Sequence, residues 1–336
     1  MLDDPRSELK DFGTVQFTTH NTTHNAELII TNEATPKITV ASAICEAWDL
    51  DRPGLLLRVT GSVDYSSDLS AMESVLEGVV YAVSSANGFI FSTGLDFGMA
   101  SLIGSTIDRE RHRCQAPLIG VASWSSVQGR DQLLPSKGAA KGSKRKYADT
   151  QPDDNLSTVS LQSVHTHFIL VEGAGALIDP SDSASNRLIK ARVHSFTYAH
   201  ALEQAVAEHK TGDVSLKTAE RREGRYTPRL PMVLNGDKTT LREVTGYAEA
   251  GYGVVLLAAA TGGLASALAA YLRGAAPSGE WRAHEKEFAV LKALHDAKSK
   301  SGPWPLFHVS HEVGKKGVIE EILDAATLQA VDKHTR

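Results

Sequence analysis

Short apolar runs alternate with longer amphipathic stretches along most of the chain. We expect buried strands at residues 55–60, 89–92, 117–123, 167–171, 230–234, 253–257 and 306–309. Helices are expected at residues 69–86, 98–111, 185–226, 240–250, 285–297 and 318–330. This alternation predicts an α/β fold: a Rossmann-like, doubly wound, mostly parallel sheet with helices on both faces.

Two stretches interrupt the alternation. Residues 1–12 are expected to form a flexible N-terminus, followed by β-like runs at 14–17 and 38–40 and a short helix over 40–48. Residues 134–160 carry a basic and then an acidic segment with few large apolar side chains, which predicts an exposed loop there. We therefore expect a single domain over residues 13–330.

Residues 252–272 carry no charge and are about long enough to cross a bilayer. Three residues at their centre, Thr261, Gly262 and Gly263, favour a chain reversal. The half before this turn is short and β-like, and the half after it is rich in alanine. The pattern therefore predicts a buried strand, a glycine turn and a packed helix, and no membrane span within the chain.

Charge and cysteine content narrow the class of protein. The net charge is −5 and the pI is about 6.2, whereas a nucleic-acid-binding domain usually carries a basic excess. Cys45 and Cys114 are too few for a disulfide framework or a zinc site of their own, and they fit a reducing compartment. His165 and His167 lack partners at metal-ligand spacing. We expect no metal site and no nucleic-acid partner.

Small polar residues and glycines follow four of the expected strands. A glycine lets the backbone approach a phosphate, and the helix that follows directs free N–H groups toward it. Because these loops all follow strands, they are predicted to line one crevice that binds a nucleotide. The candidate ligand-binding residues are Thr60, Gly61, Ser62, Thr93, Gly94, Gly98, Met99, Asn235, Gly236, Thr239, Thr240, Thr261, Gly262 and Gly263.

Each of these features also has a purely structural interpretation. The glycine loops are equally typical of tight turns between strands and helices. Trp124 follows an expected strand and could either stack on a base or fill the core. Glu243 lies in the first turn of an expected helix, where a carboxylate is favoured by the helix dipole alone. The residues by themselves leave these alternatives open.

The order of several short motifs resembles the cytosolic N-terminal homology region of melastatin-type (TRPM) channels, the family called SLOG or LSDAT. The resemblance covers roughly residues 13–330. The motifs are Trp48-Asp49-Leu50, Val59-Thr60-Gly61, Ser92-Thr93-Gly94, Ile119-Gly120-Val121-Ala122-Ser123-Trp124, His165-Thr166-His167-Phe168-Ile169-Leu170-Val171 and Pro231-Met232-Val233-Leu234-Asn235-Gly236-Asp237-Lys238-Thr239-Thr240.

This resemblance implies a Rossmann-like fold and, as in some members, a site for ADP-ribose or NAD. It also implies a cytoplasmic location, with attachment to the membrane through a channel portion outside this chain. The related Lonely-guy phosphoribohydrolases cleave N-glycosidic bonds, and the resemblance places Glu243 at their catalytic glutamate. Two departures stand out: Asp237 and Thr239 replace glycines of the family loop, and residues 259–263 lack the acid and the arginine usual there.

The sequence thus favours a nucleotide-binding or nucleotide-sensing SLOG domain, alone or in a calcium-permeable cation channel or signalling protein. Its expected partners are a small nucleotide and either further copies of itself or the remainder of a channel. One alternative is an N-glycosidic nucleotide hydrolase that uses Glu243. The other is a degenerate domain that serves assembly. The altered loops weigh against the hydrolase, so we expect little or no enzymatic activity.

Overall fold

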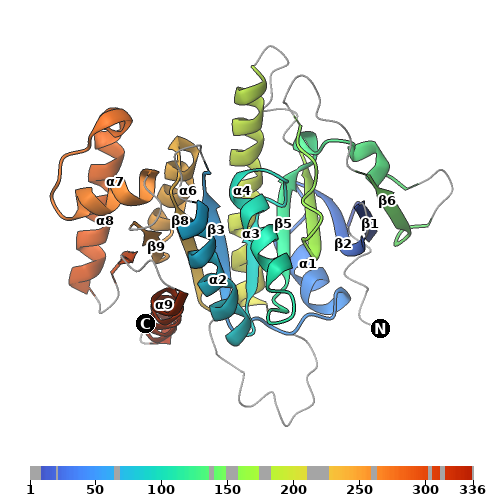
Figure 1. Ribbon diagram of the computed structural model, residues 1–336, viewed down its shortest axis with the longest axis horizontal. Helices are drawn as coiled ribbons and strands as arrows, with labels where there is room; N and C mark the ends of the chain where they lie inside the picture. Colours follow the sequence, from blue (N-terminus) through green and yellow to red (C-terminus); the bar gives the residue numbers. More distant parts are fainter. Residues whose placement is uncertain are drawn as a thin grey trace, which may run out of the picture. The chain divides into compact units, whose positions relative to one another are not determined.

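The computed structural model describes residues 9–19, 22–63, 69–135, 140–148, 158–173, 183–209, 227–258, 263–301, 305–310 and 315–334. Within these ranges ten strands form one sheet in the order β10-β9-β8-β3-β4-β5-β7-β2-β1-β6 (Figure 1). The strands are β1 (Asp11–Thr19), β2 (Thr22–Asn32), β3 (Leu56–Gly61), β4 (Phe89–Ser92), β5 (Leu118–Ser123), β6 (Lys144–Tyr147), β7 (His167–Glu172), β8 (Arg229–Leu234), β9 (Val254–Leu257) and β10 (Phe307–Ser310).

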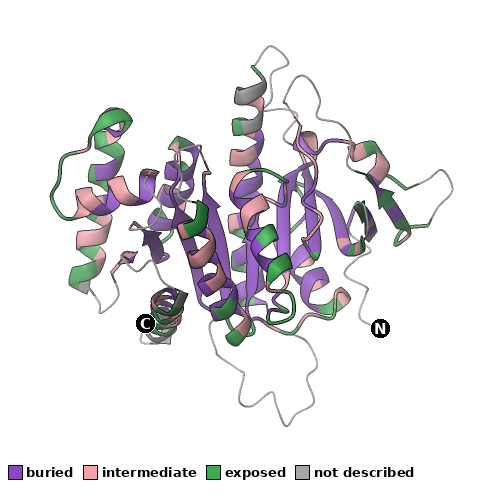
Figure 2. Ribbon diagram, in the orientation of Figure 1, coloured by how far each residue is buried: buried purple, intermediate pink, exposed green. Residues whose placement is uncertain are grey.

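Parallel pairing dominates this sheet. The pairs β1–β6, β2–β7, β5–β7, β3–β8, β8–β9 and β9–β10 are parallel, whereas β1 and β2 form an antiparallel hairpin. Central strands such as β3, β5 and β8 are buried along their whole length, as Figure 2 shows. Continuous apolar strands of this kind belong to parallel sheets that are covered on both faces. The α/β, Rossmann-like prediction is confirmed.

Eight α-helices lie between or after the described strands. They are α1 (Lys37–Ser42), α2 (Leu69–Ser85), α3 (Gly98–Arg109), α4 (Ala184–Glu208), α6 (Lys238–Glu249), α7 (Gly263–Leu272), α8 (Glu285–Ser301) and α9 (Lys315–His334). The short turns η2 (Ala43–Ala47), η3 (Trp124–Ser126), η4 (Arg130–Leu133) and η6 (Gly279–His284) complete the described elements.

The chain divides into two compact units, each built from segments that are distant in the sequence. Unit 1 is made of the described residues within 1–52, 91–104 and 117–223, and unit 2 of those within 53–90, 105–116 and 224–336. In unit 1 the hairpin alternates buried and partly exposed positions along β1, for example Val15 and Phe17 against Thr14 and Gln16. In unit 2 α9 packs against α2 and β8.

Two expectations for the N-terminal part need correction. The sheet already begins at Asp11, and Leu9 before it is buried, so order starts earlier than residue 13. The β-like run at 38–40 belongs to α1 instead. Val40 and Ile44 are both fully buried while Ile38 is 53% exposed, which is the spacing of a helix face and not of a strand.

The expected loop at 134–160 contains a strand. β6 pairs in parallel with β1, beside which Figure 1 shows it, and its side chains alternate between exposed lysines and buried Arg145 and Tyr147. Arg145 Nη2 donates to Asp11 Oδ2 over 2.8 Å, and both side chains are less than a tenth exposed. A basic segment forms a strand here because its inward-facing cation meets a carboxylate from β1. Within this stretch, residues 136–139 and 149–157 lie outside the described part.

The uncharged segment 252–272 is divided as the sequence predicts. Its first half contains β9 and its second half is α7, while residues 259–262 between them lie outside the described ranges. Among the helices that the structure describes, none combines the length and the apolar character needed to cross a bilayer.

Candidate functional site

Three of the predicted loops meet in unit 2. A Cβ added to Gly61 would lie 1.9 Å from the carbonyl oxygen of Leu234, and one added to Gly263 would lie 1.9 Å from Asn235 Oδ1. Asn235 and Gly236 both have left-handed backbone, with φ of 57° and 98°. The glycines are therefore required by contacts between the loops themselves. Thr261 and Gly262, predicted alongside Gly263, lie outside the described residues.

The start of α6 is capped by its own residues. Asp237 Oδ1 accepts hydrogen bonds from the Thr240 backbone N–H at 2.8 Å and from the Thr240 hydroxyl at 3.0 Å. The Thr240 Oγ1 accepts in turn from the Asp237 N–H at 3.2 Å, which completes a reciprocal capping box. Thr239 and Thr240 are buried. Asp237 therefore occupies the place at this helix end where a phosphate would bind.

The start of α7 is closed in a similar way. The backbone N–H of Leu264 donates to the Gly236 carbonyl at 3.0 Å, and that of Ala265 to the Asn235 carbonyl at 2.8 Å. Amide groups of a helix N-terminus are what an incoming phosphate would use. Here the loop after β8 already accepts two of them.

Glu243 is 1% exposed, and its carboxylate accepts a hydrogen bond from the Thr60 hydroxyl. A catalytic acid must reach its substrate, directly or through one water. This buried carboxylate instead links α6 to the end of β3 through its hydrogen bond with Thr60. Thr60 itself is 5% exposed, while Ser62 after it is half-buried.

In unit 1 the loop after β4 is fixed by a buried polar chain. The Gly94 N–H donates to Ser92 Oγ at 3.1 Å, and Ser92 Oγ lies 2.6 Å from His165 Nε2. Burial lowers the pKa of His165 to about 3, so its ring is neutral. His165 Nδ1 lies 3.3 Å from Gln162 Oε1. The serine and histidine resemble a catalytic dyad, but both are 1% exposed and serve to hold the loop.

The remaining predicted residues of unit 1 differ in their exposure. A Cβ on Gly94 would lie 2.7 Å from Gly120 Cα, so this loop packs directly against β5. Thr93 and Gly98 are half-buried, and Met99 is buried. Trp124, in η3, is partly buried against the unit 1 core, so one part of the indole packs inward and another reaches the surface.

His165 and His167 do not act together. His167 packs against Trp48 with ring centroids 4.5 Å apart and ring planes tilted by 43°, whereas His165 is hydrogen-bonded to Ser92. Burial lowers the pKa of His167 to about 4. Over the residues that the structure describes, no group of three or more potential ligands gathers as a metal site would require.

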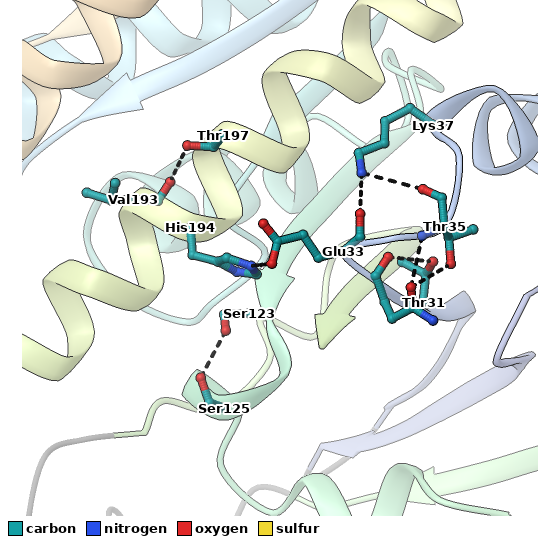
Figure 3. A network of polar contacts seen from close by, with 10 residues as sticks. Thr31, Glu33, Thr35, Lys37, Ser123, Ser125, Val193, His194 and Thr197 are labelled. Atoms are coloured by element: carbon teal, nitrogen blue, oxygen red, sulfur yellow. Dashed lines mark hydrogen bonds and ion pairs between the residues drawn. The ribbon is translucent and has the colours of Figure 1, made fainter. Parts of the chain in front are cut away.

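Sequence reasoning missed a group of titratable residues at the end of β2, of which Figure 3 shows Glu33, Lys37 and His194. This group, here called the β2-end cluster, consists of Glu33, Lys37, His194 and Tyr198. Glu33 follows β2 directly, Lys37 begins α1, and the other two lie one turn apart on α4. The four-residue spacing of His194 and Tyr198 is a visible signal, but their partner Glu33 lies far away in the sequence.

The β2-end cluster has perturbed electrostatics. Lys37 Nζ lies 4.2 Å from the Tyr198 ring centroid and donates to the Glu33 carbonyl at 2.6 Å. Burial lowers the pKa of Lys37, although the nearby Glu33 carboxylate partly opposes this. Burial raises the pKa of Tyr198 to about 12. Perturbed groups gathered at the carboxyl ends of parallel strands are typical of ligand sites.

Comparison with known proteins agrees with this architecture. The family model described as "SLOG in TRPM" matches residues 26–296. The trpm cation channel of Drosophila melanogaster is 20% identical over 296 residues, covering 85% of this chain and 13% of that protein. The rat transient receptor potential cation channel subfamily M member 4 is 23% identical over 262 residues, covering 76% of this chain and 20% of that protein.

A mouse relative, subfamily M member 2, is 26% identical over 148 residues, covering 42% of this chain and 10% of that channel. The chain thus spans only a small part of the relatives it matches. The fold defines an α/β domain of Rossmann type with polar loops at its strand ends. Because the family model covers most of the chain, the chain belongs to the SLOG family of TRPM proteins.

Proposed function

We propose that this chain is a nucleotide-sensing domain that binds a ligand of the ADP-ribose or NAD type through unit 1. We further propose that it serves as the cytoplasmic N-terminal domain of a cation channel of the M subfamily. Membership of the SLOG family and the channel names of the relatives support the second statement. The first rests on the arrangement of strand ends in unit 1.

The observation that carries the proposal is the common edge of β2, β5 and β7. These strands are parallel, with Asn32 opposite Glu172 and Ser123 opposite Val171, so their carboxyl ends lie together. Glu33 and Trp124 follow two of them. Ligands of open α/β sheets bind beyond the carboxyl ends of the strands.

In this proposal each exposed group of unit 1 has a role that suits its chemistry. The partly open indole of Trp124 stacks on the base, because aromatic faces accept any base. The Thr93 hydroxyl and the backbone of Gly98, both half-buried, face the phosphates, with the buried Gly94 and Met99 behind them. α4 packs against both β5 and η3, which brings the β2-end cluster to the same edge.

The unit 2 loops are assigned a structural role. Asp237 caps α6, the backbone carbonyls of Asn235 and Gly236 accept from α7, and Thr60 is bonded to Glu243. A phosphate would have to displace these bonds and meet the Asp237 charge. Nucleotide binding is therefore expected to depend on residues of unit 1.

Isothermal titration calorimetry with ADP-ribose, NAD and AMP tests the proposal, supported by thermal shift. A ligand at 100 times its Kd stabilises the native state by about 2.7 kcal/mol. Trp124→Leu keeps an apolar side chain but removes the π face, and is expected to weaken binding roughly tenfold, as base stacking contributes about 1–3 kcal/mol. Thr93→Val should also weaken binding. Thr327→Val, on the exposed surface of α9, is the control that should not.

A second candidate is a domain that only mediates assembly, favoured by the self-capped helices of unit 2. It predicts no heat with any of the three nucleotides and a concentration-dependent mass by size-exclusion chromatography with light scattering. The hydrolase candidate is weakened by the burial of Glu243. Release of free base from AMP, lost in Glu243→Gln, would favour it over both others.

A further inference from the structure

Glu33 is held in place by its main chain, whereas its carboxylate is open. The Glu33 N–H donates to the Glu172 carbonyl at 3.0 Å, which extends the pairing of β2 with β7. Its own carbonyl accepts from Lys37 Nζ at 2.6 Å. The side chain is 61% exposed, and among the described residues it pairs with no lysine or arginine. Its position is therefore fixed while its oxygens remain available.

The buried side chain of His194 contacts this carboxylate. Its side chain is only 3% exposed, and Nε2 lies 3.4 Å from Glu33 Oε2 (Figure 3). Neither ring nitrogen makes a hydrogen bond with another residue in the described part of the chain. Buried polar atoms without a hydrogen-bond partner are rare in native proteins, and the contact with Glu33 is the polar interaction that the structure gives this buried ring.

A glycine lies directly beside Glu33. Gly173 follows β7, and a Cβ placed there would lie 3.0 Å from Glu33 Oε2. A side chain at this position would crowd the carboxylate. Among the described residues, the glycine therefore leaves this side of the carboxylate without a neighbouring side chain at the carboxyl end of β7.

We propose that Glu33, positioned by His194, binds the ribose hydroxyls of the nucleotide, an inference that rests on the proposed function. A carboxylate accepts hydrogen bonds from two adjacent hydroxyls, which matches a vicinal diol. It would repel a phosphate, and one carboxylate is too few to hold a divalent cation. In dinucleotide-binding sheets an acid at a strand end performs this role for a ribose.

The test compares AMP and ADP-ribose with their 2′-deoxy and 3′-deoxy forms by isothermal titration calorimetry. A hydrogen bond to a charged group contributes about 1.5–3 kcal/mol, so wild type should prefer the ribose forms roughly tenfold to a hundredfold. Glu33→Gln should bring that ratio close to one. His194→Leu should lower it too, with partial rescue in His194→Gln, which a merely structural role for His194 would not produce.

The chain offers a matched control. Glu46 lies 3.2 Å from Nε2 of the buried His209, the same kind of pair as Glu33 with His194, but it lies on η2 and not after a strand. Glu46→Gln should leave the ribose preference unchanged. Wild type that binds ribose and both deoxy forms equally would overturn the inference and leave the proposed function standing. Wild type that binds no nucleotide would overturn both.

Discussion

Thr60 and Glu243 are 183 positions apart in the chain, and the hydroxyl of Thr60 donates a hydrogen bond to the buried carboxylate of Glu243. The pair joins the end of β3 to the first turns of α6. We expect Thr60→Val to destabilise the protein by about 1–3 kcal/mol, because a buried acceptor loses a donor. Urea unfolding measures this. Thr245→Val, whose hydroxyl bonds only within α6, is the control and should cost less.

The same burial predicts the absence of glycosidase activity. Incubation with AMP, ADP-ribose and NAD should release no base or nicotinamide, because the Glu243 carboxylate is 1% exposed and faces Thr60. Chromatography of the products is the measurement. Turnover that vanishes in Glu243→Gln would show that α6 opens to substrate and that this expectation is mistaken.

The Arg145–Asp11 ion pair should be important for stability. Removing one partner of a buried pair leaves an uncompensated charge, so Arg145→Met should cost about 3–5 kcal/mol. The double variant Arg145→Met with Asp11→Asn should recover part of this loss. Arg109→Met breaks the exposed pair with Glu73 and should cost less than about 1 kcal/mol. If Arg145→Met and Arg109→Met lowered the free energy of unfolding equally, the difference in burial between the two ion pairs would be contradicted.

Two glycines with similar backbone should respond differently to alanine. Gly94 and Gly98 have φ of 71° and 55°, so both substitutions carry a left-handed penalty of about 1–2 kcal/mol. The added Cβ of Gly94→Ala would also lie 2.7 Å from the backbone of Gly120, whereas that of Gly98→Ala meets nothing within 4 Å. Chemical denaturation should show Gly94→Ala as the more damaging change. A Gly98→Ala variant of equal or lower stability would argue against close packing of this loop.

His165 should make the protein less stable in acid. Its folded-state pKa is lowered by burial from 6.5 to about 3, so the unfolded chain binds a proton that the native state rejects. Stability is therefore complete above pH 6.5 and falls between about 6.5 and 3, by about 1.4 kcal/mol per pH unit. Between pH 7 and 5, the free energy of unfolding of His165→Asn should fall by about 2 kcal/mol less than that of wild type. If urea unfolding showed the same loss of unfolding free energy for wild type and His165→Asn, the ring would be protonated in the folded state and this prediction would be wrong.

The fold was largely readable from the sequence. Buried strands of a parallel sheet are continuous apolar runs, so β3, β5, β7, β8 and β9 appear in the hydrophobic pattern without any tertiary information. The pattern of residues 252–272 likewise predicted a strand followed by a helix, which are β9 and α7. Local signals of this kind were sufficient because they depend on neighbouring residues only.

Tertiary structure decided the rest. Arg145 becomes part of β6 only because Asp11 supplies a buried counter-charge, and Glu243 becomes a structural acid only because Thr60 meets it. Similarly, nothing local marks Glu33 until α4 brings His194 to the end of β2. A side chain's neighbours across the fold determine whether a charge is solvated, paired or available to a ligand, and those neighbours are absent from its sequence window.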